Sequence, residues 1–255
     1  MRDSRRSWNY TVIERVAGNF VPVNLFTSLT DASTTLSVVT DRTQAGSSMV
    51  DGELELMVHR RLQHDDNRGV GEPLNETGLD GAGLIVRSVH RVALAPAAGA
   101  GAALRAAAGA ALFHPVLSFA PLATAPAAWA AAHATTFSGL NASLPANVGL
   151  VTVQSLAPGT LLVRVAHLFA AGEDATLSAP ATVALGRVFA KLSVTAATEM
   201  TLPGTIPLAN APVSTFTTTD GKVVTLPVVD PAPVGPDFAV TVSAMQIKTY
   251  RLTVA

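Results

Sequence analysis

Short β-branched segments, separated by proline and glycine turns, place the strongest limit on how this chain can fold. Turn signals such as Pro158-Gly159 and Asp220-Gly221 punctuate these segments, and no strand alternates with a helix long enough to form a crossover. The pattern predicts a mainly β protein of the β-sandwich type. The segments expected to be strands are 34–40, 53–59, 148–155, 161–169, 181–189, 192–198, 222–226 and 238–252, the last with a break inside.

Composition divides the 255 residues into three stretches. Residues 1–92 are the most charged and hold 12 of the 18 carboxylates, all at or before Asp80. Residues 95–134 are a low-complexity zone in which 20 of 40 positions are alanine, and glycines and prolines interrupt it. This zone is expected to be a surface excursion with one short helix at roughly 102–112, because alanine favours helix. Residues 139–255 return to strand-forming valine, threonine and leucine.

Charge and cysteine content exclude several classes of function. The net charge is −1, so the chain lacks the basic surface that binds nucleic acid or an anionic membrane. It contains no cysteine, which excludes disulfides and thiolate metal sites. The first twenty residues lack the apolar core of a secretory signal, and residues 97–112 are too short and too weakly apolar to span a bilayer. No targeting signal and no membrane segment is therefore expected in this chain.

The sequence contains no complete catalytic constellation. The six histidines show no zinc-ligand spacing, so His59 and His167 are expected to be half-buried structural residues, and no metal site is expected. The one adjacent acidic pair, Asp65-Asp66, lies in a loop that also contains Arg68. Two interpretations remain open: a solvated turn in which Asp66 caps the backbone and Arg68 pairs locally, or one wall of a pocket that binds a polyol.

Three N-x-Ser/Thr triplets, at Asn9, Asn75 and Asn141, are candidate glycosylation sites. They are a mild indication of the secretory pathway.

Four motifs, in order, carry more information than composition does. They are VAGNFVPVN (16–24), TDRTQAGSS (40–48), DGELELMVHRRL (51–62) and DDNRGVGEPLN (65–75), and weaker echoes follow in RVAHLFAAGED (164–174) and MQIKTY (245–250). Together they resemble the C-terminal β region of the family 38 α-mannosidases of the lysosomal or acid type. The resemblance is strongest over residues 16–76 and weakest over the alanine-rich zone.

The resemblance implies a fold and a division of the chain. By resemblance, residues 1–200 form a β-sandwich of the galactose-mutarotase-like supersandwich kind, with the alanine-rich excursion at 95–134. A terminal β-strand region follows at 201–255.

The resemblance also implies an activity. These enzymes are zinc-dependent retaining glycosidases that remove terminal α-mannosyl residues from N-glycans in the lysosome, the vacuole or the secretory pathway. Their zinc ligands and nucleophile lie in an N-terminal domain, which is expected to be the missing partner of this chain. Asp65, Asp66, Arg68 and Gly69 match the family's loop that reaches the sugar pocket. Arg68 is expected to contact the sugar, and the two aspartates to organise the loop.

The alternative is a free-standing β domain that binds carbohydrate without catalysis or is purely structural. In either case the isolated chain is expected to be inactive and, because of an exposed apolar docking face, poorly soluble.

Overall fold

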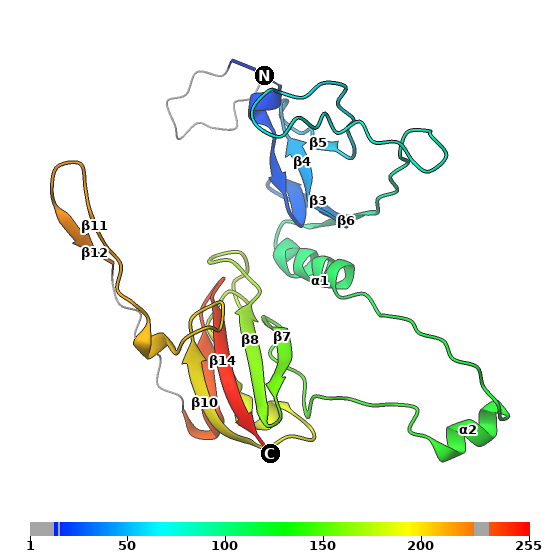
Figure 1. Cartoon of the computed structure of the whole chain (residues 1–255), viewed down its shortest axis with the longest axis vertical. Helices are drawn as coiled ribbons and strands as arrows, with labels where there is room; N and C mark the ends of the chain where they lie inside the picture. Colours follow the sequence, from blue (N-terminus) through cyan, green and yellow to red (C-terminus); the bar gives the residue numbers. More distant parts are fainter. Residues whose placement is uncertain (1–12, 15, 227–234) are drawn as a thin grey trace. The chain divides into compact units, whose positions relative to one another are not determined.

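The computed structural model describes residues 13, 14, 16–226 and 235–255, and it divides into two compact units, Met1–Leu117 and Ser118–Ala255 (Figure 1). Every strand pairing between its named strands is antiparallel. The predicted mainly β class is confirmed, and the sheets are compatible with a β-sandwich. The supersandwich type stays a prediction.

The first unit contains two three-stranded sheets and one helix. One sheet has the order β1-β4-β5 and the other the order β2-β3-β6, and α1 follows the second. The elements are η1 (Ala17–Asn19), β1 (Val21–Val23), β2 (Phe26–Thr30), β3 (Thr34–Thr40), β4 (Gln44–Ser47), β5 (Glu55–Met57), β6 (His90–Pro96) and α1 (Ala100–Leu112).

Helix α1 covers one face of the β2-β3-β6 sheet. Leu104 and Ala108 of the helix are buried against Val39 of β3, and Arg105 places its guanidinium carbon 5.0 Å from the ring centre of Phe26 on β2. The helix predicted at 102–112 is confirmed. The interpretation of this part of the alanine-rich zone as a surface excursion is wrong, because its small side chains allow the helix to approach the sheet closely.

The second unit has a layered core. A four-stranded sheet of order β10-β14-β8-β7 packs against the two-stranded sheet β13-β9, and a hairpin, β11-β12, is separate. The elements are α2 (Pro126–Ala132), β7 (Val148–Ala157), β8 (Thr160–His167), β9 (Ala181–Ala184), α3 (Leu185–Val188), β10 (Val194–Met200), η2 (Leu208–Asn210), β11 (Thr215–Thr217), β12 (Val223–Thr225), η3 (Pro236–Phe238), β13 (Ala239–Val242) and β14 (Ile247–Val254).

Branched aliphatic side chains on alternate positions fill this core. Val163 and Val165 of β8 and Leu252 of β14 are fully buried, and Val183 of β9 and Val242 of β13 close the core from the second sheet. The period-two spacing of these residues places them on one face of each strand.

Several local predictions differ from the structure. The strand expected at 181–189 ends at Ala184, and α3 takes its place. Leu185 and Val188 are both buried; in a strand, residues three apart point to opposite faces, whereas in a helix they share one. The strand expected at 53–59 is limited to β5, and the strands that were not predicted are β1, β2, β4, β6 and β11.

The boundary predicted at residue 200 stays a prediction about the domains of the whole protein. Strand β14, from the expected terminal region, pairs with both β8 and β10 in one sheet.

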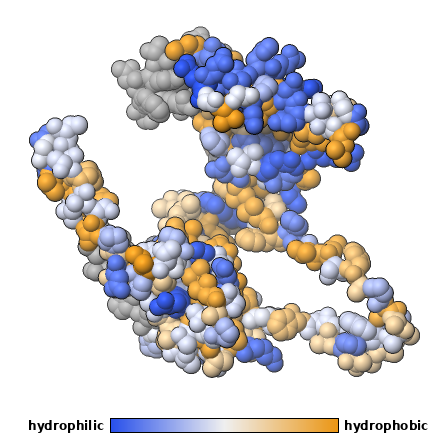
Figure 2. Space-filling view, viewed as in Figure 1, coloured by the Kyte–Doolittle hydropathy of each residue, from blue (hydrophilic) through white to orange (hydrophobic). Residues whose placement is uncertain are grey.

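The rest of the alanine-rich zone is exposed. Every residue from 112 to 143 is exposed to solvent, including the whole of α2. Figure 2 shows hydrophobic side chains in orange along the segment between α1 and α2, which contains Phe113, Val116 and Phe119. Within the described ranges, no helix combines the length and hydrophobicity needed to cross a bilayer.

Candidate functional site

The loop at residues 65–69 is organised by its two aspartates. Asp65 Oδ2 accepts a hydrogen bond of 2.9 Å from the backbone N–H of Asn67, and Asp66 Oδ1 accepts one of 3.1 Å from the backbone N–H of Arg68. Within these two turns the backbone φ angle is positive at Asn67 (58°) and at Gly69 (147°). Glycine tolerates the second of these angles without the steric cost that a side chain would add.

Arg68 is presented to solvent by this loop. Its side chain is exposed, and in the described part of the chain its guanidinium group contacts no carboxylate or carbonyl oxygen within hydrogen-bond distance. Local pairing of Arg68, one of the two interpretations of the loop, is therefore not what the structure shows. A guanidinium offers five N–H donors in a planar fork, which suits the adjacent hydroxyls of a sugar.

The base of the loop is closed by two contacts. The backbone N–H of Leu62 donates to the Leu74 carbonyl at 3.4 Å, and Arg61 Nε donates to Asn75 Oδ1 at 2.5 Å. Both join the segment before the loop to the segment after it. The loop is therefore held at its base while its tip remains free to meet a ligand.

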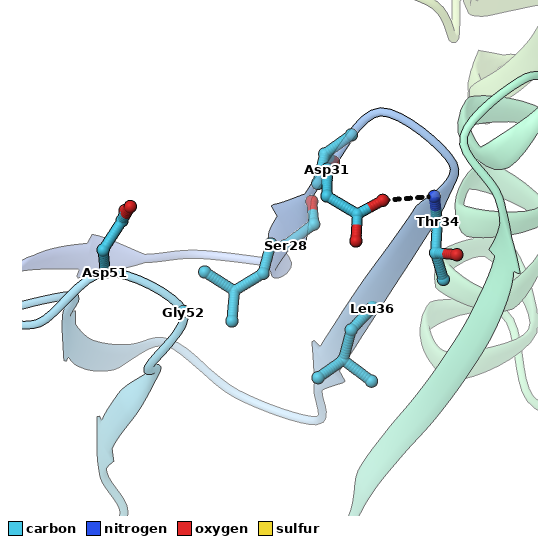
Figure 3. Close-up of a pocket in the computed structure, with 8 residues that line it drawn as sticks. Ser28, Asp31, Thr34, Leu36, Asp51 and Gly52 are labelled. Atoms are coloured by element: carbon cyan, nitrogen blue, oxygen red, sulfur yellow. Dashed lines mark hydrogen bonds between the residues drawn. The ribbon is translucent and has the colours of Figure 1, made fainter.

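A pocket of about 510 Å³ lies beside the β2–β3 turn (Figure 3). The Asp31 carboxylate faces the backbone of the turn and accepts the N–H groups of Ser33 and Thr34, each at 2.7 Å. These hydrogen bonds, that of Ser33 foremost, lower the pKa of Asp31 below its ordinary value. The lining residues are Ser28, Leu29, Thr30, Asp31, Thr34, Leu36, Asp51 and Gly52.

The sequence analysis assigned no site to Asp31 or Asp51 and did not foresee this pocket. The pocket depends on the pairing of β2 with β3 and on the return of the chain at 51–52, and neither is visible in a local motif.

A second pocket of about 590 Å³ is lined by Glu14, Val16, Ala17, Phe20, Thr43, Gln44, Ala45, Met57, Val58, His59 and Arg60. Neither of these two pockets is lined by residues of the 65–69 loop. His59, expected to be half-buried, is exposed at the rim, because β5 ends at Met57, before the strand pairing reaches it.

The described residues offer no arrangement that fits a metal ion. Among the described residues, no group of three or more His, Asp or Glu side chains converges in a way that could hold one. A zinc ion, where the family requires one, would have to be held by residues other than these.

His167 is buried in a closed network rather than exposed to a ligand. Its Nε2 lies 2.9 Å from the Ala179 carbonyl, and its Nδ1 lies 3.2 Å from the backbone nitrogen of Phe169. Asn147 Nδ2 is also bound to the Ala179 and Leu177 carbonyls at 3.0 Å each. The network ties the segment 168–180 to β8, so a structural role for this histidine is confirmed, although it is fully rather than half buried.

A second buried polar group lies across β10 and β14. Lys248 Nζ and Glu199 Oε1 are 3.6 Å apart, and Tyr250 is paired directly opposite Glu199. Burial, with the Glu199 charge adding to it, raises the pKa of the Tyr250 hydroxyl above its ordinary value. The group lies inside the core of the second unit, where no substrate reaches it, and we assign it to the structure.

Of the three glycosylation candidates, Asn75 and Asn141 are exposed. Asn9 lies outside the described residues.

Comparison with known proteins gives a consistent result. Residues 1–68 match the model of the glycosyl hydrolases family 38 C-terminal domain. The chain is 41% identical to lysosomal alpha-mannosidase of Bos taurus over 256 residues, covering 99% of this chain and 25% of that protein.

Two further relatives cover less of the chain. Lysosomal alpha-mannosidase of Homo sapiens is 45% identical over 203 residues, which are 79% of this chain and 20% of that protein. An alpha-mannosidase of Arabidopsis thaliana is 41% identical over 209 residues, which are 80% of this chain and 20% of that protein. The chain thus spans a quarter or less of the length of these relatives. It belongs to the family 38 glycosyl hydrolases, in the C-terminal region of the α-mannosidases of that family.

Proposed function

We propose that this chain works as the C-terminal part of a retaining α-mannosidase that hydrolyses terminal α-mannosyl residues of N-glycans. The observation that carries the proposal is the 65–69 loop, which presents an exposed arginine on a backbone held by two aspartates. Family membership supports the reaction class.

In this proposal Arg68 binds and orients the sugar. Its N–H groups donate to hydroxyl oxygens of the mannosyl ring, and its fixed charge requires no proton transfer to do so. Gly69 contributes through its backbone, whose positive φ turns the chain directly after Arg68. Orientation of this kind lowers the activation free energy by holding the substrate close to its reacting geometry.

Asp65 and Asp66 hold the loop and do not perform the chemistry. Each uses one carboxylate oxygen on a backbone N–H, which leaves the second oxygen able to accept a sugar hydroxyl. A retaining glycosidase needs a nucleophile and an acid/base about 5 Å apart on either side of the scissile bond. Two adjacent aspartates committed to their own loop do not provide that arrangement.

The nucleophile and the zinc ion are therefore assigned to the part of the enzyme outside these 255 residues, which is the partner of this chain. Zinc would supply charge stabilisation at the sugar there. The chain alone should bind mannosides weakly or not at all and should not hydrolyse them.

The test is kinetic and uses the whole enzyme. Arg68→Ala should reduce kcat/KM for an aryl α-mannoside by roughly 10- to 150-fold, since a hydrogen bond to a charged group contributes about 1.5–3 kcal/mol and 1.4 kcal/mol is a factor of ten. Arg68→Lys should recover only part of the loss, because lysine lacks the planar fork. Arg251→Ala, an exposed arginine on β14, is the control and should be unaffected.

If Arg68→Ala left both kcat/KM and the unfolding midpoint unchanged, the assignment of this loop to the sugar site would be wrong. Mannose binding without hydrolysis by the whole protein would instead favour the carbohydrate-binding alternative.

We also propose that the enzyme resides in the lysosome or vacuole, or elsewhere in the secretory pathway, as the name of its bovine and human relatives suggests for those proteins. Asn75 and Asn141 are exposed and would be accessible to glycosylation there. Enzymatic release of N-glycans should then convert each modified asparagine to aspartate in peptide mapping, and unmodified peptides at both sites would contradict the proposal.

A further inference from the structure

One face of the β2-β3-β6 sheet is only partly covered by the described residues of its own unit: the Asp51–Gly52 turn shares a pocket with Leu29 and Leu36, and both leucines are half-buried. Leu29, Leu36 and Leu94 are paired directly across the three strands and form one row on this face. Val38 and Val92 are paired in the next row on the same face. Directly opposed residues of antiparallel strands point to the same side of the sheet, so the five apolar side chains form one continuous surface.

This surface, called here the leucine face, is exposed at its β6 edge. Val92 is 66% exposed and Leu94 72% exposed. In Figure 3 the Leu36 side chain extends from β3 away from the strand, with the Asp51–Gly52 turn on the neighbouring segment. The leucine face carries no charged side chain in its two rows, whereas an exposed sheet face ordinarily alternates to polar residues.

The opposite face of the same sheet is covered by α1. Val39 on that side is fully buried against Leu104 and Ala108. The sheet therefore has the pattern of a strand layer that is packed on both sides. Among the described residues of this unit, however, α1 covers one face, whereas the other face meets only the 51–52 turn across a pocket.

The core of the first unit is correspondingly small. Of the described apolar residues that are buried, five lie in the first unit and fifteen in the second. The five are Val23, Val39, Ala100, Leu104 and Ala108. So small a core is a poor basis for independent stability in a unit of this length. The leucine face supplies the apolar surface that could enlarge it.

We propose that the leucine face is the surface on which the part of the α-mannosidase outside these 255 residues docks, with an apolar surface of its own. The inference rests on the proposed function and names the contact through which the two parts of that enzyme meet.

Two observations favour this occupant. The chain covers only 20–25% of its relatives' length, so about three quarters or more of a comparable enzyme would lie outside it. The match to the C-terminal domain model ends at residue 68 and includes β2 and β3, so two of the three strands belong to a domain defined in the whole enzyme.

The first experiment measures accessibility in the whole enzyme. Val92→Cys and Val223→Cys replace two strand valines that are 66% and 65% exposed in this chain, and the chain has no cysteine of its own. Each variant is treated with a maleimide, and peptide mass spectrometry follows labelling at the introduced site. We expect labelling at position 92 to be at least tenfold slower than at position 223; equal rates would overturn the proposal.

The second experiment identifies the occupant. A photo-crosslinking phenylalanine derivative is placed at Leu94, the whole enzyme is irradiated, and the cross-linked peptides are sequenced. Cross-links to residues outside the 255 support the proposal. Cross-links only to residues 118–255 of the same chain, only to a second copy, or to nothing overturn it.

Mannosidase activity of the same preparations separates the two hypotheses. An active enzyme without an external cross-link would contradict the docking surface and retain the function. An inactive enzyme with the cross-link would contradict the function and retain the surface.

Discussion

Replacing Asn147 with alanine should release the segment 168–180 from the core of the second unit. The Asn147 side chain is 7% exposed, and its Nδ2 donates to the carbonyls of Leu177 and Ala179 at 3.0 Å each. Ala179 keeps His167 Nε2 at 2.9 Å as a second donor. Among the described residues no other donor lies within hydrogen-bond distance of the Leu177 carbonyl, which the variant leaves without a protein partner.

The magnitude follows from these contacts. Loss of two net hydrogen bonds costs about 1 kcal/mol each, and the Leu177 carbonyl, which is only part-buried, adds less than the about 1–3 kcal/mol of a fully buried acceptor left without a donor. The local opening free energy should therefore fall by about 2–4 kcal/mol. At a factor of ten for each 1.4 kcal/mol, protected amides of this segment should exchange roughly 30-fold to several hundred-fold faster.

Hydrogen exchange followed by peptide mass spectrometry measures this change, since it reports each segment separately. Asn147→Asp is the decisive companion variant, because it keeps the volume but turns a donor into an acceptor that faces two carbonyl oxygens. At neutral pH, the amides of residues 168–180 should exchange at least as fast in Asn147→Asp as in Asn147→Ala. Asn210→Ala, an exposed asparagine, is the control and should leave exchange unchanged.

Amide exchange of the segment 168–180 at the wild-type rate in Asn147→Asp would contradict this prediction. That result would mean that the donated hydrogen bonds do not hold the segment, whatever the alanine variant does.

Two further predictions concern other parts of the chain. Gly204 has a φ of +81°, and an added methyl group would lie 2.8 Å from a side-chain carbon of Leu162. Gly204→Ala should therefore lower the free energy of unfolding by more than the strain of a left-handed backbone alone, which is about 1–2 kcal/mol. Gly221 has the same φ but open space around it, so Gly221→Ala is the control and should lower the thermal unfolding midpoint less. An equal decrease in both variants would refute the clash with Leu162. The hydrogen bond from Arg42 lowers the pKa of Asp41 to about 2, below its ordinary value of 3.8. The ionised Asp41 carboxylate therefore contributes its full stabilisation of the folded state above about pH 3.8, and this contribution is lost as the pH falls through about 2. Carboxyl NMR titration should show this midpoint, Arg42→Gln should move it upward, and a wild-type midpoint near 3.8 would contradict the prediction.

Some elements followed from local sequence alone. The β-branched run at 34–40 was predicted as a strand and is β3 with the same bounds, because branched side chains restrict the backbone wherever the segment lies. The helix α1 followed from alanine propensity in the same way. The turns at Asp65 and Asp66 are also local, since each aspartate binds a backbone N–H two residues later.

Other elements depended on partners far away in the chain. Strand β6 pairs with β3, whose residues lie fifty or more positions earlier in the chain, and its own sequence, HRVALAP, has only a weak strand pattern. The four residues of α3 are helical because Leu185 and Val188 must both face a core built by β8, β9, β13 and β14. No window of sequence contains either constraint.

For the candidate site, too, some features were predictable from consecutive residues and others depended on the tertiary structure. The motif around Arg68 was sufficient to place it in a loop of a family 38 α-mannosidase, because the family resemblance and the turn chemistry both reside in consecutive residues. The exposure of Arg68, the closure of the loop by Leu62 and Leu74, and the open leucine face required the tertiary structure. Solvent exposure and strand register are properties of packing, and packing joins residues that the sequence keeps apart.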